Sequence, residues 1–140
     1  MREVRLKNEK ETERFGLRLA DELKAGDCVA LIGDLGTGKT TLTKAVAKGL
    51  GIEKNIVSPT FNIVREYYDG RLPLYHFDVY RLEDPEGFYD IGAEEYLYDR
   101  QGVCIIEWAD IVRDMLPEDT KYIYIEMGDT EEERICRCTF

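Results

Sequence analysis

The sequence predicts one three-layered α/β domain with a mixed, mostly parallel central sheet and an antiparallel C-terminal portion. Apolar runs typical of buried strands alternate with amphipathic helical segments, which predicts the parallel part of the sheet. In two places extended segments follow each other directly, which predicts antiparallel pairs. No linker, repeat or low-complexity stretch divides the 140 residues, so we expect a single domain over residues 1–140.

The first two elements are a short strand and an amphipathic helix. Residues 3–6, EVRL, predict the strand, and residues 8–26 predict the helix. Asn8 is a suitable N-cap with Glu11 three residues later, and Gly26 closes the helix. The apolar stripe of this helix consists of Phe15, Leu19 and Leu23.

A buried strand, a second helix and a hairpin follow. Residues 27–33 form a continuous apolar run, as expected of a strand covered on both faces, and residues 38–50 predict a helix. Residues 61–68 and 72–82 predict two strands joined by a tight turn at Asp69-Gly70.

The remaining elements complete the predicted sheet. Residues 102–108, GVCIIEW, predict another buried strand, and residues 109–116 predict a short helix that ends at Pro117. Residues 121–127 and 134–140 predict a closing antiparallel pair.

The composition limits the classes of function. The net charge is −10 and the pI is near 4.7, so we expect partner proteins, and not a basic surface of this chain, to hold any nucleic acid. No apolar window approaches the roughly 20 residues that cross a bilayer, and the N-terminus lacks the apolar core of a signal peptide. We therefore expect a cytoplasmic protein with reduced, structural thiols at Cys28, Cys104, Cys136 and Cys138.

Residues 33–40, GDLGTGKT, match the phosphate-binding pattern G-x-x-x-x-G-K-[ST] in full. Glycines let backbone N–H groups turn toward a polyanion, and the following helix points its positive end at the phosphates. We expect Lys39 to reach the β and γ phosphates and the Thr40 hydroxyl to ligate Mg²⁺. The other predicted nucleotide-binding residues of this loop are Gly33, Asp34, Leu35, Gly36, Thr37 and Gly38.

A phosphate-binding loop of this type also needs an acid at the end of a neighbouring buried strand. Glu107 follows four apolar residues and is the favoured Mg²⁺ residue, directly or through water. Asp78 is favoured for orienting or activating the attacking water, although the sequence also allows the two roles to be exchanged. The expected catalytic residues are therefore Lys39, Asp78 and Glu107. No arginine partner for the phosphates is evident, which leaves room for a partner protein to supply one.

Several neighbouring residues have two interpretations each. The SPTF segment from Ser58 to Phe61 is either a switch whose hydroxyl, such as that of Thr60, senses the γ-phosphate, or only a rigid turn. Trp108 either packs over the nucleotide or fills the core. A lone histidine in a strand is more often a hydrogen-bonded structural residue than a catalyst, and this is the favoured interpretation of the sole histidine, His76. The tyrosines and acids of residues 84–100 form either a partner surface or ordinary packing.

Four kinds of nucleotide-binding protein carry such a loop. A small-molecule kinase usually has an arginine-bearing lid, for which little length is left. A GTPase usually carries Asn-Lys-x-Asp, which is absent from the sequence. An ATPase that drives a change in a partner needs no further domain, and a non-hydrolysing scaffold stabilised by nucleotide is the remaining alternative.

The motifs GDLGTGKTTLTK, SPTF, HFDVYRL and IIEWAD, in this order, closely resemble the TsaE/YjeE family over about residues 9–110. That family consists of small bacterial P-loop ATPases required for threonylcarbamoyladenosine modification of tRNA. The resemblance implies a P-loop NTPase fold, ATP and Mg²⁺ as cofactors, and TsaD and TsaB as partner proteins. That two-protein complex installs the group on adenosine 37 of tRNAs reading ANN codons. ATP hydrolysis would reset the complex, and tRNA would be met only through it.

The resemblance also implies roles for individual residues. Residues 36–41, including Thr41, would hold the ATP phosphates, and Thr40 with Glu107 would match the family's Mg²⁺ positions. Asp78 would match the acid that is taken as catalytic. Thr12 falls where the family approaches the adenine, whereas residues 111–140 carry no matching motif.

Overall fold

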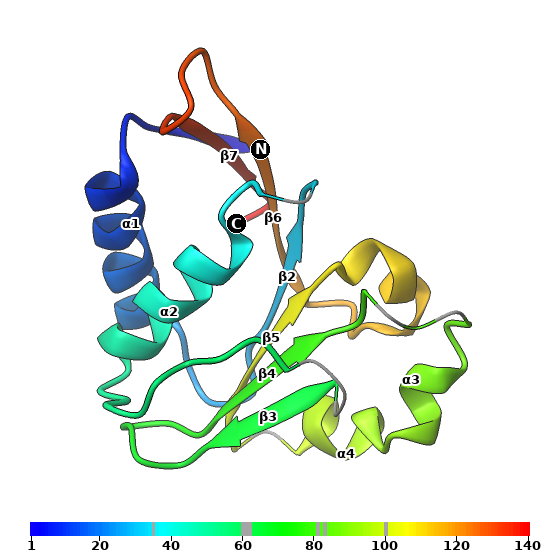
Figure 1. Cartoon of the computed structure of the whole chain (residues 1–140). Coiled ribbons are helices and arrows are strands. Elements are labelled where there is room, and N and C mark those ends of the chain that lie inside the picture. The colour runs from blue at the N-terminus through cyan, green and yellow to red at the C-terminus, as the bar shows by residue number, and fades with distance from the viewer. Residues whose placement is uncertain (35, 60–62, 81, 83, 100) are drawn as a thin grey trace.

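The computed structural model describes residues 1–34, 36–59, 63–80, 82, 84–99 and 101–140. Within these residues, one seven-stranded sheet is flanked by helices (Figure 1). The strands are β1 (Arg2–Leu6), β2 (Cys28–Ile32), β3 (Val64–Tyr67), β4 (Leu74–Asp78), β5 (Val103–Glu107), β6 (Lys121–Met127) and β7 (Arg134–Cys138). The helices are α1 (Glu9–Glu22), α2 (Lys39–Gly49), α3 (Gly87–Asp90), α4 (Ala93–Tyr98) and the 3₁₀ helix η1 (Ala109–Met115).

The strand order is β1-β7-β6-β2-β5-β4-β3. The four central strands, β6, β2, β5 and β4, are mutually parallel, and the outer pairings are antiparallel. The predicted mixed sheet with a parallel centre and an antiparallel C-terminal pair is therefore confirmed. Strand β6 belongs to both parts, because it pairs parallel with β2 and antiparallel with β7.

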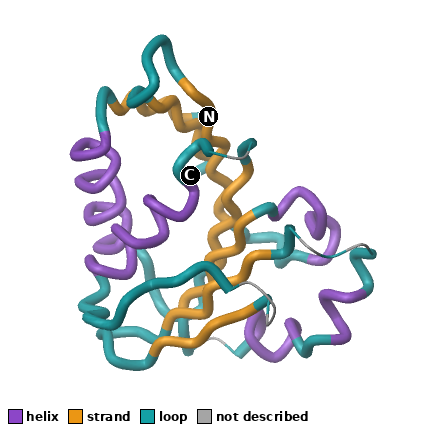
Figure 2. Tube along the Cα trace, viewed as in Figure 1, coloured by secondary structure: helices purple, strands orange, loops and turns teal. Residues whose placement is uncertain are grey.

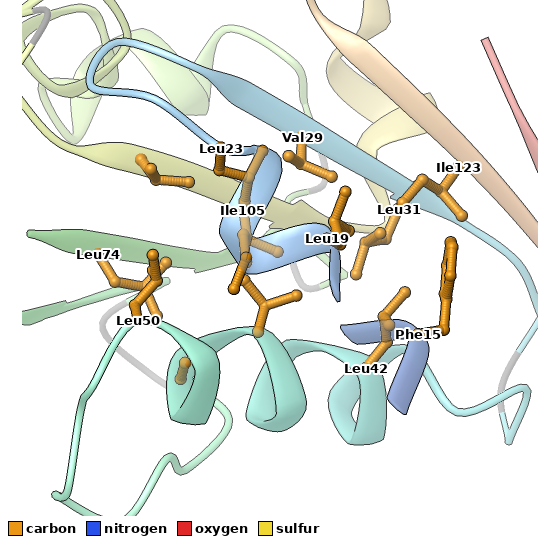
Figure 3. Packing of buried hydrophobic residues seen from close by; sticks show 14 of the residues in the cluster. Phe15, Leu19, Leu23, Val29, Leu31, Leu42, Leu50, Leu74, Ile105 and Ile123 are labelled. Carbon is orange, nitrogen blue, oxygen red and sulfur yellow. The ribbon is translucent and has the colours of Figure 1, made fainter. Parts of the chain in front are cut away.

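The helices form two outer layers, one on each face of the sheet (Figures 1 and 2). Successive residues of a strand point to opposite faces, so each buried strand feeds two cores. In β2, Val29 and Leu31 face the core beneath α1 and α2, which Figure 3 shows from close by. Cys28 and Ala30 face the second core, which contains Phe88 of α3. This two-sided burial explains why β2 reads as a continuous apolar run.

Helix α1 begins and packs as the sequence predicts but ends earlier. The Asn8 side chain accepts a hydrogen bond from the Glu11 amide at 3.0 Å, which confirms the N-cap. The apolar stripe, Phe15, Leu19 and Leu23, lies in the core (Figure 3). The helix ends at Glu22, and Leu23 already has an extended backbone. Gly26 therefore lies in the following turn, and its amide donates to the carbonyl of Gly102.

The predicted hairpin is present, but its connection is longer than a tight Asp-Gly turn. Strand β3 ends opposite the start of β4, which leaves residues 68–73 as the loop. The carboxylate of Asp69 accepts hydrogen bonds from the amides of Glu53 and Lys54, at 3.0 and 3.4 Å. The Arg71 amide donates to the carbonyl of Leu50 at 2.7 Å. The Asp-Gly pair thus docks the loop on the end of α2 and does not close a two-residue turn.

Strand β4 is also shorter than predicted, because it ends at Asp78 and not at Leu82. The Asp78 carboxylate accepts a hydrogen bond from the Tyr80 amide at 3.0 Å. An aspartate that captures the amide two residues on forms a turn that competes with the strand. The segment after Asp78 therefore turns away at the edge of the sheet where the parallel strands end.

No helix in the described part of the chain combines the length and the apolar character needed to cross a bilayer. All four cysteines are buried as free thiols. Burial raises the pKa of Cys28 and of Cys136 to about 12. The reactive thiolate is therefore scarce at neutral pH, and it is also shielded from reagents.

The folded protein should accordingly resist alkylation by iodoacetamide at neutral pH. We expect no rapid modification of the native protein and complete modification of the four thiols in denaturant, measured as the mass of the intact chain. Rapid labelling of the native protein at any of the four positions would contradict the burial described here.

Candidate functional site

The phosphate-binding loop joins β2 to α2 at the carboxyl end of the parallel strands (Figure 1). Gly38, with φ of 94°, is the N-cap of α2 in a left-handed conformation that a side chain would strain. Gly33 has no room for a side chain, since a Cβ there would lie 2.5 Å from the carbonyl oxygen of Ile125 on β6. The first amides of α2 have no carbonyl partner within the helix, as at any helix N-terminus, so they are available to an anion.

The ammonium of Lys39 lies within the curve of its own loop. It donates to the carbonyl oxygens of Gly33 and Asp34, at 2.5 and 2.9 Å, and only 5% of the residue is exposed. Burial lowers the pKa of Lys39, and the charges of Glu107 and Asp78 partly oppose that shift. The ammonium also lies 4.0 Å from the centre of the Trp108 ring, a cation–π contact. Lys39 is thus preplaced beside the loop as a localised positive charge.

Oxygen atoms from three segments meet beside Lys39. The Thr40 hydroxyl donates to Glu107 Oε1 at 3.0 Å, and the Ser58 hydroxyl lies 3.5 Å from Thr40 Oγ1. Carboxylate and hydroxyl oxygens are hard ligands of the kind Mg²⁺ takes when it keeps several waters. The residues present therefore fit a magnesium ion that is bound mainly through Thr40 and Glu107. No group of three or more His, Cys, Asp or Glu side chains suited to another metal occurs among the residues described.

The Glu107 carboxylate is fixed from behind by a histidine. His76 Nε2 lies 2.5 Å from Glu107 Oε2, and the two residues are 0% and 2% exposed. Both face the α2 side of the sheet, because they alternate with residues of the opposite core on neighbouring parallel strands. The interpretation of His76 as a hydrogen-bonded buried residue is confirmed. Its partner was not predictable, since the two residues are 31 positions apart.

Asp78 lies directly beside Glu107, as the register of β4 and β5 pairs these two residues. Burial raises the pKa of Asp78, while the hydrogen bond from the Tyr80 amide lowers it and the neighbouring Glu107 raises it further. Asp78 is half-buried and lines the same cavity as Lys39. A carboxylate with a raised pKa at this position is suited to accept a proton from a water molecule.

One cavity of about 460 Å³ contains most of the predicted residues. Those that line it are Thr12, Gly36, Gly38, Lys39, Thr40, Thr41, Asp78, Glu107 and Trp108. Gly33, Asp34 and Thr37 belong to the loop but are not among the residues that line the cavity. The Thr37 hydroxyl donates to the Asp34 carbonyl at 2.8 Å. Leu35 and Thr60, which the sequence also assigned to the nucleotide, lie outside the described residues. In the SPTF segment, the described hydroxyl of Ser58 does line the cavity.

Trp108 contacts both the core and the cavity, and its packing over a nucleotide stays a prediction. Its ring packs partly against the second core, and it also lines the cavity beside Lys39. The exposed ring of Tyr80 lies against it, with ring centres 4.7 Å apart. The tyrosines of residues 84–99 are divided between packing and the surface. Tyr96 packs against Phe77, whereas Tyr89 and Tyr98 are exposed.

The cavity also contains residues that the sequence did not indicate. Glu9 precedes Thr12 on α1, Glu131 and Glu132 come from the turn between β6 and β7, and Arg134 is the first residue of β7. The run DTEEER looks like an ordinary solvated turn in the sequence, and no local motif marks it. The only signal that finds Arg134 is the sheet order, which places β7 two strands from β2. The structure therefore brings an arginine to the cavity that the sequence did not indicate, with its guanidinium bonded to backbone carbonyls.

Comparison with known proteins gives a consistent result. The family model described as "Threonylcarbamoyl adenosine biosynthesis protein TsaE" matches residues 6–136. The tRNA threonylcarbamoyladenosine biosynthesis protein TsaE of Bacillus subtilis is 49% identical over 127 residues, covering 90% of this chain and 78% of that protein. Its namesake from Treponema pallidum is 47% identical over 117 residues, covering 84% and 85%. The crystal structure of Bacillus subtilis YdiB superposes with a TM-score of 0.82 at 41% identity, covering 98% of this chain and 84% of that one.

Proposed function

This chain belongs to the TsaE family of tRNA threonylcarbamoyladenosine biosynthesis proteins, and from that membership we propose that it is a Mg²⁺-dependent ATPase of that pathway. One observation carries the proposal. A complete phosphate-binding loop places the Thr40 hydroxyl 3.0 Å from the buried carboxylate of Glu107, within the cavity that Lys39 lines. A loop that served only stability would need neither the buried acid nor its supporting histidine.

In this proposal each residue has a separate task. Lys39 and the amides at the start of α2 bind the β and γ phosphates of ATP. Thr40 and Glu107 hold Mg²⁺, which when bound neutralises charge on the phosphates. His76 keeps the Glu107 carboxylate turned toward Thr40.

Asp78 and Trp108 complete the proposed site. Asp78 orients the attacking water and accepts its proton, for which its raised pKa is suited. Trp108 shields Lys39 from solvent on one side, and Thr12 borders the end of the cavity nearest α1. The adenine would lie at that end.

We further propose that the hydrolysis serves the TsaD–TsaB complex, which modifies adenosine 37 of tRNAs reading ANN codons. The chain carries a net charge of −10, which is unsuited to holding tRNA on its own surface. Docking on partner proteins is the alternative that this charge favours. ATP hydrolysis would then reset the complex between rounds, and the group itself would be transferred elsewhere.

The test is ATP hydrolysis by the purified chain, alone and with TsaD, TsaB and tRNA. We expect slow turnover by the chain alone and a rise of roughly tenfold or more with the complex, because partners commonly complete such sites. The Lys39→Ala variant with the complex is the control for contaminating activity. Turnover that is equal with and without the complex would remove the pathway step while leaving the ATPase proposal standing.

A further inference from the structure

We propose that Arg134, at the start of β7, is a positioning residue that holds the phosphate-binding loop in its nucleotide-binding shape. It acts through backbone carbonyls of the loop and not through the phosphates. The expected effect on ATP binding rests on the proposed function, whereas the hydrogen bonds from Arg134 to the loop do not depend on it.

The guanidinium of Arg134 donates to four backbone carbonyls. Nε donates to Thr37 at 2.8 Å and Nη2 to Gly36 at 3.4 Å, both in the phosphate-binding loop. Nη1 donates to Glu131 at 2.5 Å and to Glu133 at 2.9 Å, in the turn that precedes β7. A guanidinium is planar and its N–H groups have fixed directions, so these bonds tie the turn and the loop in one geometry.

The direction of a carbonyl also fixes the amide of the next residue. A trans peptide unit is planar, and its C=O and N–H point in opposite directions. Because Arg134 holds the Thr37 carbonyl, the amide of Gly38 points away from the guanidinium. Within the described part of the chain this amide has no acceptor, and it lies at the N-cap of α2. We call the hydrogen bonds from Arg134 to the carbonyls of Gly36 and Thr37 the clamp. The clamp therefore presents a free donor at the helix start, where an anion binds.

The clamp matters because two glycines of the loop leave its backbone a choice of conformations. Gly36 and Gly38 both have positive φ, a conformation that glycine adopts along with many others. An unheld loop would have to be ordered when ATP binds, and that ordering would weaken binding. Arg134 orders the loop during folding, before any nucleotide arrives.

The first experiment measures the clamp without nucleotide. We would compare amide hydrogen exchange of residues 36–40 in the wild type, Arg134→Ala and Arg137→Ala. Arg137 lies on the same strand but is only partly exposed and pairs with Glu126 and Glu3, so it is the matched control. We expect faster exchange of the loop in Arg134→Ala alone, with the exchange of β2 and β5 unchanged. Equal loop exchange in all three proteins would overturn the inference.

The second experiment measures the consequence for ATP. Binding is followed by the fluorescence of Trp108, the single tryptophan of the chain, which lies beside Lys39. We expect Arg134→Ala to bind ATP roughly tenfold or more weakly. The loop loses its hydrogen bonds to the charged guanidinium and must then be ordered when ATP binds. Arg137→Ala should bind as the wild type does.

The Arg134→Lys variant separates geometry from charge, and it serves if the alanine variant fails to fold. A lysine keeps the positive charge but cannot span the carbonyls of Gly36 and Thr37. We expect it to show fast loop exchange and weak ATP binding as well. Full recovery of both by lysine would overturn the clamp in favour of simple charge attraction. A wild type that binds no ATP would refute the proposed function, whereas the exchange comparison would still decide the clamp.

Discussion

The Lys39→Ala variant should lose ATP binding by roughly a hundredfold or more and show no measurable turnover. The ammonium is the localised positive charge of the loop, and charge-assisted hydrogen bonds to phosphate contribute about 1.5–3 kcal/mol each. It donates to the carbonyls of Gly33 and Asp34, so it is already oriented. Alanine removes both the charge and this orientation.

Binding is measured by titrating ATP against the fluorescence of Trp108. The matched control is Lys44→Ala, an exposed lysine further along α2, which should bind ATP as the wild type does. The unfolding temperature of each variant shows whether the fold is intact. If Lys39→Ala bound ATP with unchanged affinity, the loop would not be the nucleotide site, and the proposed function would fail with it.

The Glu107→Gln variant should bind ATP in the absence of Mg²⁺ but lose roughly a hundredfold or more of Mg²⁺-dependent turnover. Glutamine has the same shape and keeps an oxygen that can accept from Thr40, but it lacks the charge that a divalent cation requires. The loss of that charge should affect the metal more than the nucleotide, because the phosphates contact the loop and α2. Glu107→Ala should show the same separation with an additional loss of stability, since His76 would be left buried without its partner.

Two measurements separate the alternatives for the acids. ATP binding is titrated with and without Mg²⁺, and turnover is measured over a range of Mg²⁺ concentrations. We expect Asp78→Asn to keep the Mg²⁺ dependence of binding while losing turnover, and Glu118→Gln, an exposed acid before β6, to match the wild type in both. Loss of the Mg²⁺ response in Asp78→Asn, with its retention in Glu107→Gln, would exchange the two proposed roles.

Much of the fold was predictable because its signals are local. The N-cap of α1 depends on Asn8 and Glu11, three positions apart, and the buried strands show themselves as unbroken apolar runs. Two of the errors of extent, those at the hairpin connection and at the end of β4, have one cause. Asp69 and Asp78 form hydrogen bonds with backbone amides that divert the chain from regular pairing, and the sequence pattern does not show which amides they meet.

By itself the sequence determined the α/β class, the phosphate-binding loop, and the two acids that follow buried strands. Each of these depends on residues close together in the chain, where spacing and polarity carry the physical signal. Only the tertiary structure decided that His76 supports Glu107 and that Arg134 reaches Gly36 and Thr37. Those contacts depend on strand register and sheet order, which are set by the packing of the whole core and not by any one segment.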